Sequence, residues 1–140
     1  MIIDMPRKIS RCFFTFLIVL SLTATLSSAE PGQKIVRRVQ FERGRTTAVL
    51  KGTIRHGQEI VYVLRASKGQ TLTAHITATT PNNDVVFSIE GPGGMALTDG
   101  IDTDWSGTLP ATGDYRISVG MIESKASQYT LEVTIRNRGD

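Results

Sequence analysis

The chain has 140 residues, with 16 basic and 13 acidic side chains and a single cysteine, Cys12. This length suits one domain with a core of its own, and one cysteine excludes a disulfide framework within the chain. A net charge of +3 is too small to indicate a nucleic-acid-binding protein.

The first predicted element is a signal peptide, residues 1–29. Three basic residues between positions 7 and 11 precede an uncharged apolar run, 12–26, that is too short to span a membrane comfortably. Small residues at 27–29 then stand where a signal peptidase cleaves. Cleavage after Ala29 leaves 111 residues with 13 basic and 12 acidic side chains and no cysteine. We therefore expect a periplasmic or secreted protein with no membrane segment in its mature form; an uncleaved N-terminal anchor is the alternative.

Residues 30–38 are polar and basic and show no clear period, so we expect a flexible N-terminal arm there. From residue 39 onward, apolar side chains recur at every second position, which is typical of strands buried on one face. Leu72, Ala74 and Ile76, which alternate with threonine and histidine, show this pattern most clearly. The other segments with this alternation are 39–41, 48–54, 60–64, 85–89, 105–109, 115–119 and 129–135.

Clusters of glycine, proline, asparagine and aspartate separate these segments, as turns require. Short strands at this spacing predict an all-β domain over residues 39–136, an antiparallel β-sandwich or jelly-roll of seven to eight strands. Residues 137–140 are the expected C-terminal tail.

Residues that could support catalysis are scarce in the mature chain. Only His56 and His75 could act as imidazole bases; His75 is expected on the solvated face of a strand and His56 in a turn. No serine stands in a Gly-x-Ser-x-Gly motif, and the sequence has neither a phosphate-binding loop nor a histidine or cysteine pair at metal-ligand spacing. We therefore expect a binding protein rather than an enzyme, with no catalytic residues and no cofactor.

The segment Asp99-Gly100-Ile101-Asp102-Thr103-Asp104 is the best candidate for a metal site, because alternating carboxylates can bind calcium. It lacks the bidentate glutamate of a helix-loop-helix calcium site, and aspartate and glycine are common in turns. We expect a turn without a metal; a structural calcium is the alternative.

The larger aromatic residues fall on the inward phase of their strands and are expected to pack in the core. A sugar-binding platform needs aromatic rings on an outward face or in loops, so this placement argues against one. The outward positions instead mix cations and carboxylates, as a solvated sheet surface does. These charged residues are Lys51, Arg65, Glu90, Arg116, Glu132 and Arg136.

Two segments, Phe41–Gly52 and Tyr62–Gln70, resemble the periplasmic inhibitors of goose-type (g-type) lysozyme. The inhibitors share a lead-in with phenylalanine and glycine, a short strand that ends in glycine, and a tyrosine strand that runs into a Lys-Gly-Gln turn. Three later segments match as well: 91–93, 107–115 and 128–133. The resemblance covers about residues 39–136 and implies a compact β-sandwich that protects the cell against a lysozyme.

The same pattern also resembles the bacterial pre-peptidase C-terminal domain, through the late sequence Gly-x-Leu-Pro-x-x-Gly-x-Tyr at 107–115. A domain of that type standing alone implies a module that binds the cell envelope or a polysaccharide. The fold by itself does not choose between the two functions, since a scaffold does not determine its site.

The inhibitor resemblance implies that protruding turns occlude the active-site cleft of g-type lysozyme without covalent chemistry. Two turns are the candidates here, one around residues 55–58 and the other at 121–127. The first lacks the tyrosines that are characteristic of the inhibitors, and the second is shorter, with one cation. The predicted contact residues are Arg55, His56, Gln58, Glu123 and Lys125. Ordinary solvated turns are the alternative.

Overall fold

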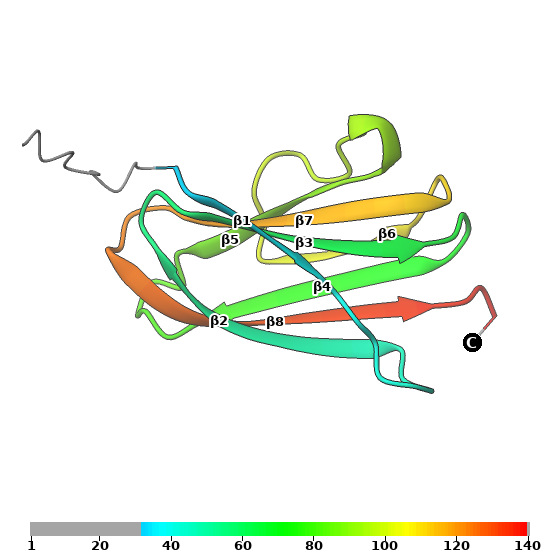
Figure 1. The fold of residues 1–140 in the computed structure, drawn as a ribbon, viewed down its shortest axis with the longest axis horizontal. Helices are drawn as coiled ribbons and strands as arrows, with labels where there is room; N and C mark the ends of the chain where they lie inside the picture. Colours follow the sequence, from blue (N-terminus) through cyan, green and yellow to red (C-terminus); the bar gives the residue numbers. More distant parts are fainter. Residues whose placement is uncertain (1–31, 140) are drawn as a thin grey trace, which may run out of the picture.

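The computed structural model describes residues 32–139, which form eight strands and one 3-10 turn (Figure 1). The strands are β1 (Lys34–Arg38), β2 (Thr47–Arg55), β3 (Glu59–Ala66), β4 (Thr71–Ala78), β5 (Val85–Glu90), β6 (Asp104–Thr108), β7 (Gly113–Met121) and β8 (Ala126–Arg136). The 3-10 turn, η2, is Pro92–Gly94. The predicted signal peptide lies outside the described residues. Within those residues, no helix is long and apolar enough to cross a membrane.

The strands form two four-stranded sheets that pack face to face (Figure 1). The first sheet has the order β1-β3-β7-β5 and the second the order β2-β8-β4-β6. Every neighbouring pair is antiparallel except β1 and β3, which run parallel. The predicted all-β sandwich is confirmed.

Strand β1 corrects the prediction of a flexible arm over 34–38; residues 30 and 31 of that arm lie outside the described residues. The residues of β1 pair with β3 in continuous register, from Lys34 opposite Glu59 to Arg38 opposite Val63. Only Ile35 in this strand packs toward the core, and the other four residues are exposed. A five-residue edge strand with one inward side chain cannot show a period of two, which is why its sequence resembles a loop.

The core lies between the sheets and consists of the inward-facing residues that the alternation predicted. Apolar side chains at every second position of β3, β4, β5, β7 and β8 are almost fully buried. Burial of these side chains is the main stabilising contribution to a domain without disulfides, at roughly 25 cal/mol per Å² of apolar surface. The largest of them are Tyr115, Phe87, Ile54, Ile60, Leu64, Leu72 and Ile76.

A pair of buried tyrosines joins the two sheets. The hydroxyl groups of Tyr62 on β3 and Tyr129 on β8 form a hydrogen bond of 2.6 Å. Gly52 on β2 lies directly opposite Tyr129, and a Cβ atom at that position would approach the tyrosine hydroxyl oxygen to 2.7 Å. Glycine is therefore required there, because a larger residue would displace the ring.

The turns that connect the strands gather at the two ends of the sandwich (Figure 1). The β2–β3, β4–β5 and β7–β8 turns lie at one end, near the start of β1, and the β3–β4 and β6–β7 turns lie at the other with the C-terminus. Both turns that the sequence predicts as contact sites are at the first end.

Candidate functional site

The two predicted contact turns lie side by side. Arg55, the last residue of β2, is opposite Ala126, the first residue of β8. One position further, the His56 N–H donates a hydrogen bond of 2.9 Å to the Lys125 carbonyl oxygen. The β2–β8 ladder therefore continues into the turns, and we call the end formed by residues 55–58 and 122–125 the turn edge.

The β2–β3 turn is closed by backbone and side-chain hydrogen bonds. The Gln58 N–H donates to the Arg55 carbonyl at 3.0 Å, and the Gln58 side-chain oxygen accepts from the Arg55 N–H at 2.9 Å. The Gln58 amide nitrogen donates to the Gln33 side-chain oxygen at 3.2 Å. Gly57 has a φ of 85°, which glycine adopts without strain. Gln58 thus holds the turn together from within.

The β7–β8 turn is anchored by Asp84, which precedes β5. One carboxylate oxygen of Asp84 accepts hydrogen bonds from the backbone N–H groups of Ser124, at 2.7 Å, and Glu123, at 3.3 Å. The other oxygen accepts from the Thr80 hydroxyl at 2.7 Å. The Asp84 carbonyl also accepts from the N–H of Ile122 at 3.0 Å. Three turn amides therefore converge on one aspartate.

This bonding also stabilises the ionised form of Asp84. Hydrogen bonds from the Ser124 side chain, the Thr80 hydroxyl and the Ser124 backbone hold the pKa of the Asp84 carboxyl far below its usual range. The group is ionised at any physiological pH, so the anchor of the β7–β8 turn is a permanent carboxylate.

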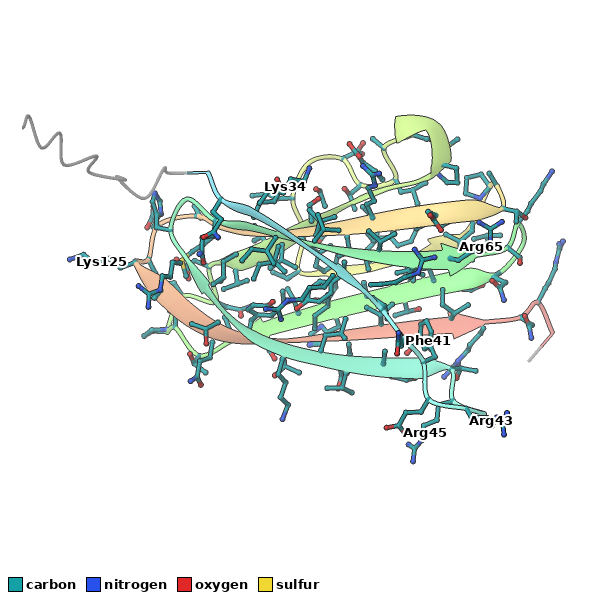
Figure 2. The ribbon with its side chains drawn as sticks, in the orientation of Figure 1. Lys34, Phe41, Arg43, Arg45, Arg65 and Lys125 are labelled. Atoms are coloured by element: carbon teal, nitrogen blue, oxygen red, sulfur yellow. The ribbon has the colours of Figure 1, made fainter. Side chains whose placement is uncertain are left out.

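Four of the five predicted contact residues are exposed on the turn edge: Arg55, His56, Glu123 and Lys125. Figure 2 shows Lys125 at the tip of this end. Gln58 is only partly exposed and its amide is used inside the turn. The edge can therefore offer two permanent cations, one imidazole and one carboxylate to a partner, on a backbone that is already ordered.

His75, the other histidine, lies on the outer face of the second sheet. Its Nδ1 is in close contact with a carboxylate oxygen of Asp104 on β6, directly across the strand pair. This contact agrees with the predicted solvated face. His75 lies opposite Glu132 on β8, whereas the turn edge adjoins Ala126, the first residue of that strand. The two histidines therefore do not form one site.

The segment Asp99–Asp104 connects the two sheets. The N–H and C=O groups of Asp102 exchange hydrogen bonds with Phe87 on β5, and the Thr103 carbonyl accepts from the Ile76 N–H on β4 at 2.9 Å. Its carboxylates are not gathered around one point, and within residues 32–139 no three histidine, cysteine, aspartate or glutamate side chains form a group able to hold a metal.

Sequence reasoning missed the two residues that support the turn edge, Asp84 and Gln33. Asp84 belongs to a Pro-Asn-Asn-Asp cluster that the sequence marks only as a turn. Its contact with Ser124 spans 40 positions, and no local pattern reports such a pairing. Gln33 precedes β1, which sequence reasoning assigned to a flexible arm.

The fold places the chain in the class of β-sandwich domains built from two four-stranded sheets. No protein-family model and no curated protein matches the sequence. The solved structure of Aeromonas hydrophila PliG, a periplasmic lysozyme inhibitor of g-type lysozyme, is 31% identical and has a TM-score of 0.65. The match covers 75% of this chain and 99% of that one. The chain therefore belongs to the PliG family, the periplasmic lysozyme inhibitors of g-type lysozyme.

Two further solved structures are similar to the chain to a lower degree. PliG from Salmonella Typhimurium is 23% identical, with a TM-score of 0.55 and coverage of 75% of this chain and 99% of that one. The pre-peptidase C-terminal domain of a Bacillus anthracis collagenase is 11% identical, with a TM-score of 0.48 and coverage of 76% and 100%. The second likeness is too distant to bear on function.

Proposed function

We propose that this protein inhibits a g-type lysozyme by occluding its active-site cleft without covalent chemistry, in the periplasm or outside the cell. The observation that carries the proposal is the 31% identity to Aeromonas hydrophila PliG over 99% of that protein's length. The exposed groups of the turn edge contact the enzyme, and the remainder of the sandwich holds them in position.

The order of the turn edge supports this mechanism. A partner binds more tightly to groups that are already held in place, because less conformational entropy is lost on association. Here the ladder between His56 and Lys125 and the bonds to Asp84 hold both turns before any partner arrives.

The charges of the edge support it as well. Glycoside hydrolases act through a pair of carboxyl groups in the cleft. Arg55 and Lys125 would be attracted to such a cleft and would speed association, with contacts that weaken as salt rises.

A peptidoglycan-clearing assay tests the proposal. Purified residues 30–140 are added across a concentration series to a g-type lysozyme and, in parallel, to hen-type lysozyme. We expect dose-dependent loss of g-type activity with the hen-type activity unchanged. Because both enzymes act on the same substrate, unchanged hen-type activity also excludes nonspecific adsorption of the protein to the peptidoglycan. No effect on either enzyme would contradict the proposal and favour the alternative of a module that binds the envelope glycan.

A further inference from the structure

The outer face of the β2-β8-β4-β6 sheet contains a hollow of about 480 Å³, next to the turn edge but outside it. Its outward-facing lining is polar and comes from three adjacent strands. Register places Lys51, Thr130 and Thr77 in one row across β2, β8 and β4, and Thr53 and Gln128 in the next row.

Hydrogen bonding differs between this hollow and three cross-strand pairs elsewhere on the same face. Farther along the sheet, Thr47 bonds to Thr134 and Thr73 bonds to Ser106, each at 2.9 Å. These outer side chains satisfy one another across the strands, as does the pair formed by His75 and Asp104.

The side chains in the hollow have no such partners. Among residues 32–139, the hydroxyls of Thr53, Thr77 and Thr130 and the side-chain amide of Gln128 make no hydrogen bond to another side chain. No carboxylate of the described chain lies within 4 Å of the Lys51 ammonium. The hollow therefore presents an unused cation beside three unused hydroxyls and an amide.

This set of groups matches the chemistry of an acidic sugar. Hydroxyl and amide groups both donate and accept hydrogen bonds, as the hydroxyls of a sugar ring require. Groups within a row lie about 4.8 Å apart and successive rows on one face about 6.6 Å apart, so groups of both rows can bond to the same short glycan. One ammonium at the margin suits one carboxylate. No aromatic ring faces outward here to stack on a sugar, so the binding depends on these polar contacts.

We propose that this hollow binds a short oligosaccharide that carries carboxylates, with Lys51 against a sugar carboxylate and Thr53, Thr77, Thr130 and Gln128 bonded to ring hydroxyls. The site is separate from the turn edge, and its existence does not depend on lysozyme inhibition. Binding there would hold the protein near acidic envelope or capsular glycans.

The experiment is an NMR titration of ¹⁵N-labelled residues 30–140 with trigalacturonate, and in parallel with uncharged triacetylchitotriose, at matched ionic strength. We expect trigalacturonate to shift the amide signals of Thr53, Thr77, Gln128 and Thr130. Lys51→Met should weaken trigalacturonate binding about two- to fivefold, the equivalent of a single charge contact at an exposed site. It should leave the weaker binding of triacetylchitotriose unchanged.

A matched pair of threonine variants separates the hollow from the rest of the face. Thr77→Val removes an unused hydroxyl and should weaken trigalacturonate binding. Thr73→Val makes the same change on the same face of β4, but the Thr73 hydroxyl is already bonded to Ser106, so this variant should bind trigalacturonate as the wild type does. Both keep a β-branched residue in the strand, so the fold is preserved.

Two results would overturn the inference. One is that the amide signals of the hollow do not shift. This result includes the case in which the only signals that shift belong to other basic positions, such as Arg43 and Arg45, which Figure 2 shows on the β1–β2 loop. The other is an equal loss of binding in Thr77→Val and Thr73→Val. The clearing assay on Lys51→Met gives an independent readout, because this variant should inhibit lysozyme as the wild type does.

Discussion

The hydrogen bond between Tyr62 and Tyr129 is a buried polar contact that joins the two sheets. Burial, together with the bond to Tyr62, raises the pKa of Tyr129 well above its ordinary value, so the hydroxyl stays protonated. Each hydroxyl satisfies the other in a buried position. Loss of one therefore leaves the other buried and unsatisfied, which is more costly than loss of both.

A double-mutant cycle tests this pair. Tyr62→Phe should lower the free energy of unfolding by about 1–3 kcal/mol, the desolvation cost of one unsatisfied hydroxyl. Adding Tyr129→Phe should recover part of that loss, because the second change removes the unsatisfied group. Urea unfolding of the wild type, both single variants and the double variant measures the coupling. Additive losses would show that the two hydroxyls act independently.

Asp84 predicts an acid-dependent stability. Its pKa is lower in the folded protein than the value near 3.9 of an unfolded chain, so the folded state binds the proton less tightly. The stabilisation is therefore complete above about pH 4 and is lost as the pH falls toward the folded-state pKa.

Asp84→Asn should lower the melting temperature at pH 7, and the difference from the wild type should shrink as the pH falls below about 4. Thermal unfolding followed by circular dichroism from pH 7 to pH 2 measures this. Asp99→Asn, at an exposed position, is the control. A difference that stays constant with pH would mean that the Asp84 charge does not stabilise the fold.

Among the elements, β1 differs most from its sequence pattern. It pairs in parallel with β3 at the edge of the first sheet, and the preceding residue, Gln33, contacts the turn edge through Gln58. The strand therefore links the N-terminal segment to the candidate site.

Ile35→Ala tests whether β1 is a stable part of the domain. Ile35 packs against the core but is only partly buried, so we expect a loss of about 1–2 kcal/mol, below the range for a fully buried isoleucine. Val36→Ala is the matched control: its side chain is 61% exposed, and the change should stay within about 0.5 kcal/mol. Equal and negligible effects in urea unfolding would restore the interpretation of a flexible arm.

At the scale of the whole molecule, the two ends of the sandwich have different roles in the proposed function. The turn edge carries Arg55 and Lys125, and the opposite end carries other exposed cations, including Lys68 in the β3–β4 turn and Arg43 in the β1–β2 loop. Inhibition by occlusion should depend on the first end alone.

Charge reversal of Arg55→Glu together with Lys125→Glu should raise the concentration needed for half-inhibition of g-type lysozyme about tenfold or more. The control, Arg43→Glu with Lys68→Glu, changes the net charge equally at the opposite end and should leave inhibition near the wild-type level. Circular dichroism confirms that each variant is folded. Similar losses in both double variants would indicate that net charge, rather than the turn edge, governs inhibition.

The sequence alone determined the fold class and seven of the eight strands, because a strand buried on one face must alternate apolar and polar residues. The alternation at 39–41 also predicted a strand, and this prediction is wrong, since these residues lie in the connection between β1 and β2. The sequence also carried the motifs by which the chain resembles the inhibitor family. The tertiary structure decided the rest, since those features depend on pairings between distant segments. The Asp84 anchor, the contact between His56 and Lys125, and the parallel pairing of β1 all join residues whose local sequence indicates only turns or loops. The polar hollow likewise exists only because β2, β8 and β4 lie side by side in this order.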